Sequence, residues 1–204
     1  MPKSQRKVKI HRKTSETDIK ISLNLDGTGK GKIRTGIPFL DHMLMAFSRH
    51  GFFDLEVLAK GDLDIDIHHT NEDVGICLGE AVKKAVKDKK GINRFGFYYV
   101  PMDEALVRVV IDISGRASLH FTGKGLPKSQ KIHTMHKQYS FNYLKQFLYA
   151  FCVHSGINMN VGVECGEDSH HMIEAAFKAL GRSLNMAVAK NKNVLGIPST
   201  KGQL

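Results

Sequence analysis

Two copies of one short pattern place a glutamate behind two adjacent histidines. The copies are HHTNE, with His68, His69 and Glu72, and HHMIE, with His170, His171 and Glu174. Each glutamate follows the first histidine by four residues and the second by three, so a helix beginning at the pattern would present all three side chains on one face. Imidazole and carboxylate ligands suit Mn, Fe, Zn or Ni better than Ca or Mg, and the patterns contain no cysteine for a closed structural zinc site. The sequence therefore predicts divalent metal binding at both patterns.

The two patterns belong to a longer internal repeat. A matching apolar segment lies upstream of each, DHMLMAFSRHG in the first copy and KQFLYAFCVHSG in the second. His170 follows His68 by 102 residues and Leu148 follows Leu44 by 104, so the copies differ by a small change in loop length. Such a long period with only two copies argues against a solenoid. We expect two half-domains packed into one compact unit.

The elements around the patterns alternate between strands and helices. Alternating apolar residues before an Asp-Gly turn predict a hairpin over residues 18–36. Helical periodicity or strand alternation predicts helices at 38–51, 70–87, 140–156 and 169–189, and strands at 54–62, 95–100, 105–114, 117–121 and 157–165. The expected fold class is α+β, with a sheet and helices on one of its faces in each half. The single domain, 1–204, would comprise pseudo-repeats at about 13–95 and about 96–190, followed by a substrate-binding tail.

Composition limits the functional class. The chain has 204 residues, 42% of them hydrophobic and 25% charged, which is typical of a globular domain. Cys77, Cys152 and Cys165 lack CxxC spacing, which favours buried thiols in a reducing cytoplasm. No apolar run approaches the roughly 20 residues of a membrane span, and the basic start lacks the apolar core of a secretory signal. We expect a cytoplasmic protein without a membrane partner.

The charge indicates an anionic partner. A formal net charge of +10 favours nucleic acid, an acidic surface or a phosphorylated metabolite. The basic residues are scattered and form no known nucleic-acid module. Candidate phosphate ligands are Arg94, Arg116, Lys178, Ser199 and Lys201.

Acidic residues precede both histidine patterns. Asp64, Asp66 or Asp168 could orient an imidazole through its second nitrogen. Alternatively, they lie in solvated turns, or at helix N-termini where the helix dipole favours acids. Asp103 and Glu104 head a strand, where one of them could be structural.

Five segments, in order, resemble the imidazoleglycerol-phosphate dehydratase family of histidine biosynthesis. They are TGIPFLDHML, GDLDIDIHHTNEDVGICLGEA, PMDEAL with the following DISGR, HHMIEAAFKALGRSL and PSTKG, and the resemblance extends from about Lys13 to Gly202. It implies conversion of imidazole glycerol phosphate to imidazole acetol phosphate with loss of water. It also implies two Mn²⁺ ions per active site, at subunit contacts of an octahedral shell assembled from trimers. Removing a weakly acidic hydrogen near an imidazole requires the ring to act as an electron sink, and metals on its nitrogens would favour the imidazolate.

The family's site residues carry over onto this chain. The resemblance implies that Glu16, in SETDIK, is the catalytic acid/base. The implied metal ligands are His42, His68, His69, Glu72, His170, His171 and Glu174. The implied substrate-binding residues are Glu16, His42, His50, His68, Glu72, Arg94, Arg116, His170, Lys178, Ser199 and Lys201.

An eighth ligand of the family is not matched. Many members have a histidine where this chain has Gln146, and the internal repeat independently aligns Gln146 with His42. Glutamine offers a neutral carbonyl oxygen, a weaker ligand than imidazole. The segment 123–137, with His133 and His136, does not resemble the family closely, and these two histidines have no assigned role.

Together with this resemblance, the sequence predicts a manganese-dependent, homo-oligomeric dehydratase acting on a phosphorylated imidazole, with no nucleic-acid partner. One alternative is a metal-binding relative that lost turnover through the change at Gln146. The other is a basic nucleic-acid-binding protein, suggested by the net charge of +10. Weak DNA binding that vanished at moderate salt would leave this alternative without support, because scattered charge gives only nonspecific attraction.

Overall fold

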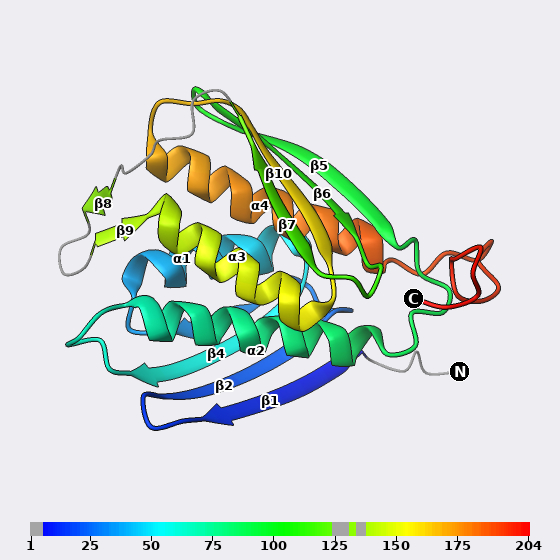
Figure 1. Cartoon of the computed structure of the whole chain (residues 1–204), viewed down its shortest axis with the longest axis horizontal. Helices are drawn as coiled ribbons and strands as arrows, with labels where there is room; N and C mark the ends of the chain where they lie inside the picture. The colour runs from blue at the N-terminus through cyan, green and yellow to red at the C-terminus, as the bar shows by residue number, and fades with distance from the viewer. Residues whose placement is uncertain (1–5, 124–130, 134–137) are drawn as a thin grey trace.

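The computed structural model describes residues 6–123, 131–133 and 138–204. The elements in chain order are β1 (Lys7–Lys13), β2 (Thr17–Asn24), β3 (Gly31–Arg34), α1 (Pro38–Gly51), β4 (Asp54–Gly61), α2 (His68–Val86), β5 (Phe95–Met102), β6 (Ala105–Asp112), β7 (Ser118–Thr122), β8 (Lys131–His133), β9 (Gln138–Ser140), α3 (Phe141–Ser155), β10 (Asn158–Cys165) and α4 (Ser169–Val188). Two four-stranded sheets enclose the long helices (Figure 1). The expected α+β class is confirmed.

The two sheets share one topology. Their strand orders are β1-β2-β4-β3 and β5-β6-β10-β7, so each sheet places its own first, second, fourth and third strands in chain order side by side. β4 pairs antiparallel with β2 and parallel with β3. β10 likewise pairs antiparallel with β6 and parallel with β7. The same order and the same directions are what an internal duplication predicts.

The hairpin expected over residues 18–36 is wrong. β4 lies between β2 and β3, and β3 reaches its parallel partner through α1, because parallel strands need a crossover connection. The true hairpin partner of β2 is β1, with Lys13 opposite Asp18. β1 begins at Lys7 and is the first strand of this sheet.

The helices of the two halves meet between the sheets. α1 and α2 cover the first sheet, α3 and α4 cover the second, and the close pairs are α1 with α4 and α2 with α3 (Figure 1). A Cβ added at Gly79 would lie 2.6 Å from the carbonyl oxygen of Phe151, and one added at Gly181 would lie 2.5 Å from that of Phe47. The glycine positions differ by 102 residues and the phenylalanine positions by 104, the offsets of the sequence repeat. Both helix pairs therefore cross in the same register.

Apolar residues of both halves fill this layer. In β2 and β6 alternate residues are buried toward the helices, as in Ile19, Ile21 and Val109. Cys77 and Cys152 are buried, and burial raises the pKa of each thiol to about 12. Cys165 is exposed, so the expectation of a buried thiol is wrong there, because it lies at the end of β10.

Two points of the sequence analysis remain, namely the histidines of segment 123–137 and the membrane span. His136 lies outside the described residues, and for His133 the structure describes only its backbone in β8. Within the described ranges, no helix combines the length and apolar character needed to cross a membrane.

Candidate metal and phosphate site

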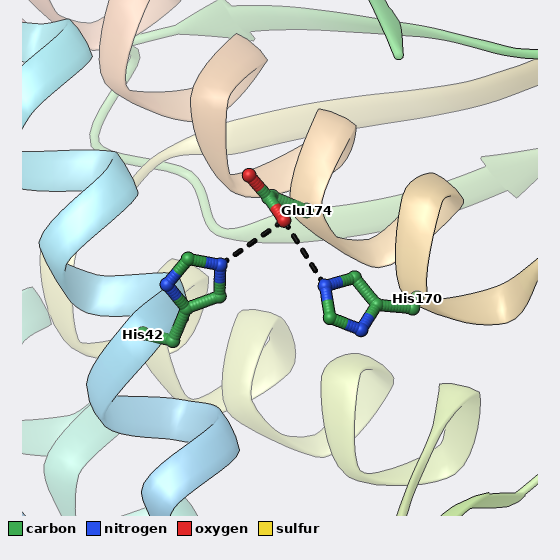
Figure 2. A group of neighbouring side chains, drawn as sticks. All are labelled: His42, His170 and Glu174. Carbon is green, nitrogen blue, oxygen red and sulfur yellow. Dashed lines mark hydrogen bonds and ion pairs between the residues drawn. The ribbon is translucent and has the colours of Figure 1, made fainter. Parts of the chain in front are cut away.

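Three predicted ligands from two helices form a compact cluster. His42 on α1 and His170 on α4 each place Nε2 3.1 Å from Oε2 of Glu174 (Figure 2). Their ligand atoms all lie within 4.8 Å of one another. His170 and Glu174 share a face because they are four residues apart on α4. One half therefore supplies His42 and the other supplies the remaining two ligands.

Lys178 lies one further turn along α4 and contacts the other oxygen of the carboxylate. Its Nζ is 2.8 Å from Oε1 of Glu174. Burial acts to raise the pKa of Glu174, but hydrogen bonds from Lys178 and His42 outweigh burial and hold that pKa below its ordinary value. His50, in the last turn of α1, has a lowered pKa because it is partly buried and faces Lys178 and Arg182. The cluster thus keeps an ionised carboxylate beside a lysine.

The first-half pattern forms the corresponding pair on α2. His68 Nε2 is 3.2 Å from Oε2 of Glu72, four residues later. α2 begins at His68 rather than at the expected Thr70, so both histidines of the pattern lie in its first turn. Gln146 lies on α3, which packs against α2, and its Oε1 is buried without a hydrogen-bond partner in the described part of the chain.

The second histidine of each pattern is oriented by a carboxylate. His69 Nδ1 is 2.8 Å from Asp62 Oδ2, and His171 Nδ1 is 2.7 Å from Glu104 Oε2. These contacts raise the pKa of both histidines. A carboxylate at Nδ1 fixes the ring and directs Nε2 toward a metal. His69 and His171 do not join the His42 cluster within this chain.

The structure distinguishes the acids that orient imidazoles from those that lie at helix N-termini. Asp66 accepts the backbone N–H of His68 at 2.8 Å, and Asp168 caps α4 by accepting that of His170 at 2.7 Å. Both therefore serve helix N-termini, where side-chain oxygens satisfy free backbone donors. Asp64 is exposed. The sequence indicated that an acid of this run could orient an imidazole, but it did not identify Asp62 as that acid.

Glu104 is the more strongly tied of the two orienting carboxylates. Its Oε1 accepts the backbone N–H groups of Asp168 at 2.8 Å and Glu167 at 3.1 Å. These bonds, with that from His171, lower the pKa of Glu104 to about 2. Glu104 therefore joins the β5–β6 turn to the start of α4. This role matches the structural alternative considered for the PMDEAL segment.

Glu16 lies in the β1–β2 turn beside His69. Its Oε2 is 3.7 Å from His69 Nδ1, and its side chain is 54% exposed. Thr14 Oγ1 accepts the backbone N–H of Glu16 at 3.1 Å and of Thr17 at 3.0 Å, which fixes the turn. The side chain is thus held near one histidine pattern and remains accessible to a substrate.

The C-terminal tail helps to form a basic cavity of about 530 Å³. Arg94 anchors the tail, because its Nη1 donates to the carbonyl oxygen of Pro198 at 2.9 Å and its Nε donates to Asp112 at 2.6 Å. Four of the predicted substrate-binding residues line the cavity, namely Arg94, Arg116, Ser199 and Lys201. Lys83 and Lys89 also line it, although no motif marked them. Such a group of cations and a hydroxyl suits a phosphate.

Lys178 lies apart from this cavity, beside the metal-ligand cluster. The backbone N–H of Arg94 meets Ala187 near the end of α4, whereas His170 lies at its start. A rise of about 1.5 Å per residue puts about 25 Å between these two positions on the helix. The cluster and cavity of one chain are therefore too far apart for one small metabolite to reach both.

Known proteins match this chain over most of its length. A family model described as imidazoleglycerol-phosphate dehydratase matches residues 35–184. The imidazoleglycerol-phosphate dehydratase of Thermoanaerobacter pseudethanolicus is 53% identical over 200 residues, covering 98% of this chain and 100% of that protein. The enzyme of the same name from Geobacillus thermodenitrificans is 50% identical over 199 residues, covering 98% and 99%.

Solved structures give the same assignment. The dehydratase from Pyrococcus furiosus, in complex with (S)-C348, has a TM-score of 0.80 and 34% identity, covering 96% of this chain and 100% of that one. The Staphylococcus aureus enzyme has a TM-score of 0.77 and 34% identity, covering 91% and 99%. With its histidine patterns, duplicated sheets and basic cavity in the context of these matches, the chain belongs to the imidazoleglycerol-phosphate dehydratase family of hydro-lyases.

Proposed function

We propose that this protein dehydrates imidazole glycerol phosphate to imidazole acetol phosphate in histidine biosynthesis, in the cytoplasm. The observation that carries the proposal is that this member of the family has both histidine–carboxylate clusters and a basic cavity. Histidine and carboxylate clusters suit an imidazole-binding metal centre, and the cavity containing Arg94 and Arg116 suits the substrate's phosphate.

The donor set fits two Mn²⁺ ions per active site. We assign as ligands His42, His68, His69, Glu72, His170, His171 and Glu174. The fit rests on the close approach of His42, His170 and Glu174, and on the carboxylates that fix the rings of His69 and His171. Bound manganese would act as a Lewis acid that stabilises the deprotonated imidazole ring.

The chain's own residues would bind the substrate and move protons. In the reaction the carbon next to the ring loses its hydroxyl, the neighbouring carbon loses a hydrogen, and the resulting enol becomes a ketone. Glu16 would transfer protons, since its carboxylate is exposed and lies beside His69. Arg94, Arg116, Ser199 and Lys201 would hold the phosphate, and this would fix the reacting carbons relative to Glu16.

Each active site would be shared between copies of the chain. The separation of about 25 Å along α4 between cluster and cavity supports this sharing, because one substrate must contact both kinds of site. Lys178 would then bind the substrate, with His50 nearby, at a site whose cavity belongs to another copy. We propose the assembly of the family, an octahedral shell of trimers with the sites at subunit contacts.

The direct test is an assay of the purified, manganese-loaded protein with imidazole glycerol phosphate, following formation of the ketone product. We expect multiple turnovers and production of imidazole acetol phosphate. Absence of turnover in a fully assembled, metal-loaded protein would instead favour the non-catalytic metal-binding relative. Light scattering of the same preparation would report the assembly.

A further inference from the structure

The two helix pairs place Gln146 and His42 at equivalent positions. The α1–α4 and α2–α3 crossings share one register, because Gly181 meets the Phe47 carbonyl as Gly79 meets the Phe151 carbonyl. The same offsets relate Gln146 to His42, 104 residues apart, and Glu72 to Glu174, 102 residues apart. Gln146 therefore occupies the position on α3, relative to the His68 and Glu72 pair, that His42 occupies on α1 relative to His170 and Glu174.

The amide oxygen of Gln146 is itself unusual. Gln146 Oε1 is buried and has no hydrogen-bond partner among the residues that the structure describes. A buried carbonyl oxygen without a donor is disfavoured, and an ion that it could ligate is one way to satisfy it. The buried oxygen and the position of Gln146 indicate the same role, that of a metal ligand. Gln146 would complete the α2–α3 group of His68 and Glu72, as His42 completes the α1–α4 group of His170 and Glu174.

The two groups differ in ligand strength. The α1–α4 group offers two imidazoles and a carboxylate that is 8% exposed, whereas the carboxylate of Glu72 is 44% exposed. Gln146 supplies a neutral oxygen in place of an imidazole, which binds Mn²⁺ more weakly. Lys178 lies beside the α1–α4 group, and the corresponding residue of α2 is Ile76, which has no charge. Lys178 contacts Oε1 of Glu174, whereas both imidazoles contact Oε2. The oxygen that faces the imidazoles therefore remains available to a metal.

We propose that the two metal positions of this protein are unequal and that the one containing Gln146 binds Mn²⁺ more weakly and fills second. The proposal rests on the proposed function in assuming that both groups bind metal. At limiting manganese the assembly would carry metal mainly at the His42 positions.

Titration of MnCl₂ into the chelator-stripped, full-length protein tests this directly. Calorimetry and the electron paramagnetic resonance signal of free Mn²⁺ should resolve two classes of site per chain, with dissociation constants about tenfold or more apart. Even changes outside the ligand shell alter metal affinity by roughly 10- to 100-fold. Two sites per chain of equal affinity would overturn the proposal. Absence of any Mn²⁺ binding would instead overturn the metal-dependent function.

Reciprocal variants assign the classes to residues. Gln146→His should tighten only the weaker class and bring it toward the stronger one, and Gln146→Glu should tighten the same class through its added charge. His42→Gln should weaken only the stronger class. Tyr149→Phe, at a side chain 61% exposed on the same helix α3, provides the matched control. If Gln146→His and Gln146→Glu both fold, by circular dichroism, and leave both classes unchanged, residue 146 is not a ligand.

Discussion

The two halves of the molecule have the same frame and different chemistry. Their strand order, strand directions and helix crossings match, and glycines permit both crossings. Yet His42 corresponds to Gln146, and Lys178 corresponds to Ile76. The turn that carries Glu16 in the first half carries Asp103 and Glu104 in the second. The positions that set backbone approach and the two histidine patterns are thus equivalent between halves, while side chains beside the patterns, such as His42 and Gln146, have diverged.

Removal of metal should have the largest effect, since it affects both halves at once. Chelation is expected to abolish dehydratase activity and to loosen the assembly, because ligands at subunit contacts link metal binding to association. Activity assays and light scattering before and after chelation check this, with added MnCl₂ restoring both. Full activity in metal-free protein would contradict the proposed mechanism.

The β1–β2 turn carries the proposed acid/base, Glu16, whereas Glu104 in the β5–β6 turn orients a histidine. Glu16→Gln tests the role of the first turn. The amide cannot take up or release a proton at neutral pH, so turnover should fall by about 100- to 10,000-fold. Manganese stoichiometry, measured on the same sample, should remain that of the unmodified protein. Near-normal turnover would transfer the acid/base role to another group, and Asp103, 3.5 Å from His171, would be the next to test.

The carboxylates that orient His69 and His171 provide a matched comparison between halves. Asp62→Asn and Glu104→Gln should each weaken manganese binding by about 10- to 100-fold, because the imidazole loses its fixed orientation. The effect should be larger at Glu104, which also accepts two backbone N–H groups at the start of α4. Calorimetric titration measures both, with Glu164→Gln on β10 as the control. Unchanged affinity in both variants would mean that these carboxylates do not contribute to metal binding by the two histidines.

Substitution of the glycine at either helix crossing, Gly79 or Gly181, should destabilise the fold by a similar amount. Gly79→Ala and Gly181→Ala would each place a Cβ within 2.6 Å of a carbonyl oxygen. We expect each to destabilise the fold by about 1–3 kcal/mol, as overpacking does. Thermal unfolding monitored by calorimetry checks this, with Gly196→Ala, which meets nothing within 4 Å, as the control. A large effect in only one half would show that the crossings are not equivalent.

The sequence predicted local features and the duplication better than it predicted pairing. Helical spacing of His170 and Glu174 placed them on one face, and apolar alternation located β2 and β6. The hairpin prediction failed because alternation shows which face of a strand is buried but does not identify the neighbouring strand. β3 pairs with β4 only after the α1 crossover, a non-local choice that no turn signal specifies.

In the candidate site, too, the sequence pattern did not show which residues the fold would bring together. Four predicted phosphate ligands converge on one cavity, but Lys83 and Lys89 carried no motif to distinguish them from surface lysines. Asp62 lies seven residues before His69, in a run where several acids had the same apparent role. Only the folded chain determines which acid reaches the imidazole and which ones cap a helix.

The pairing of α1 with α4 also affects how the chain acquires its structure. Their contacts join segments more than a hundred residues apart, and those of α2 with α3 join the two halves as well. Folding is slower when contacts join distant parts of a chain, because loop closure is costly before those contacts form. Until α3 and α4 emerge from the ribosome, the apolar faces of α1 and α2 have no native cover beyond the first sheet. We therefore expect the first half, although a repeat of the sequence, not to fold stably on its own.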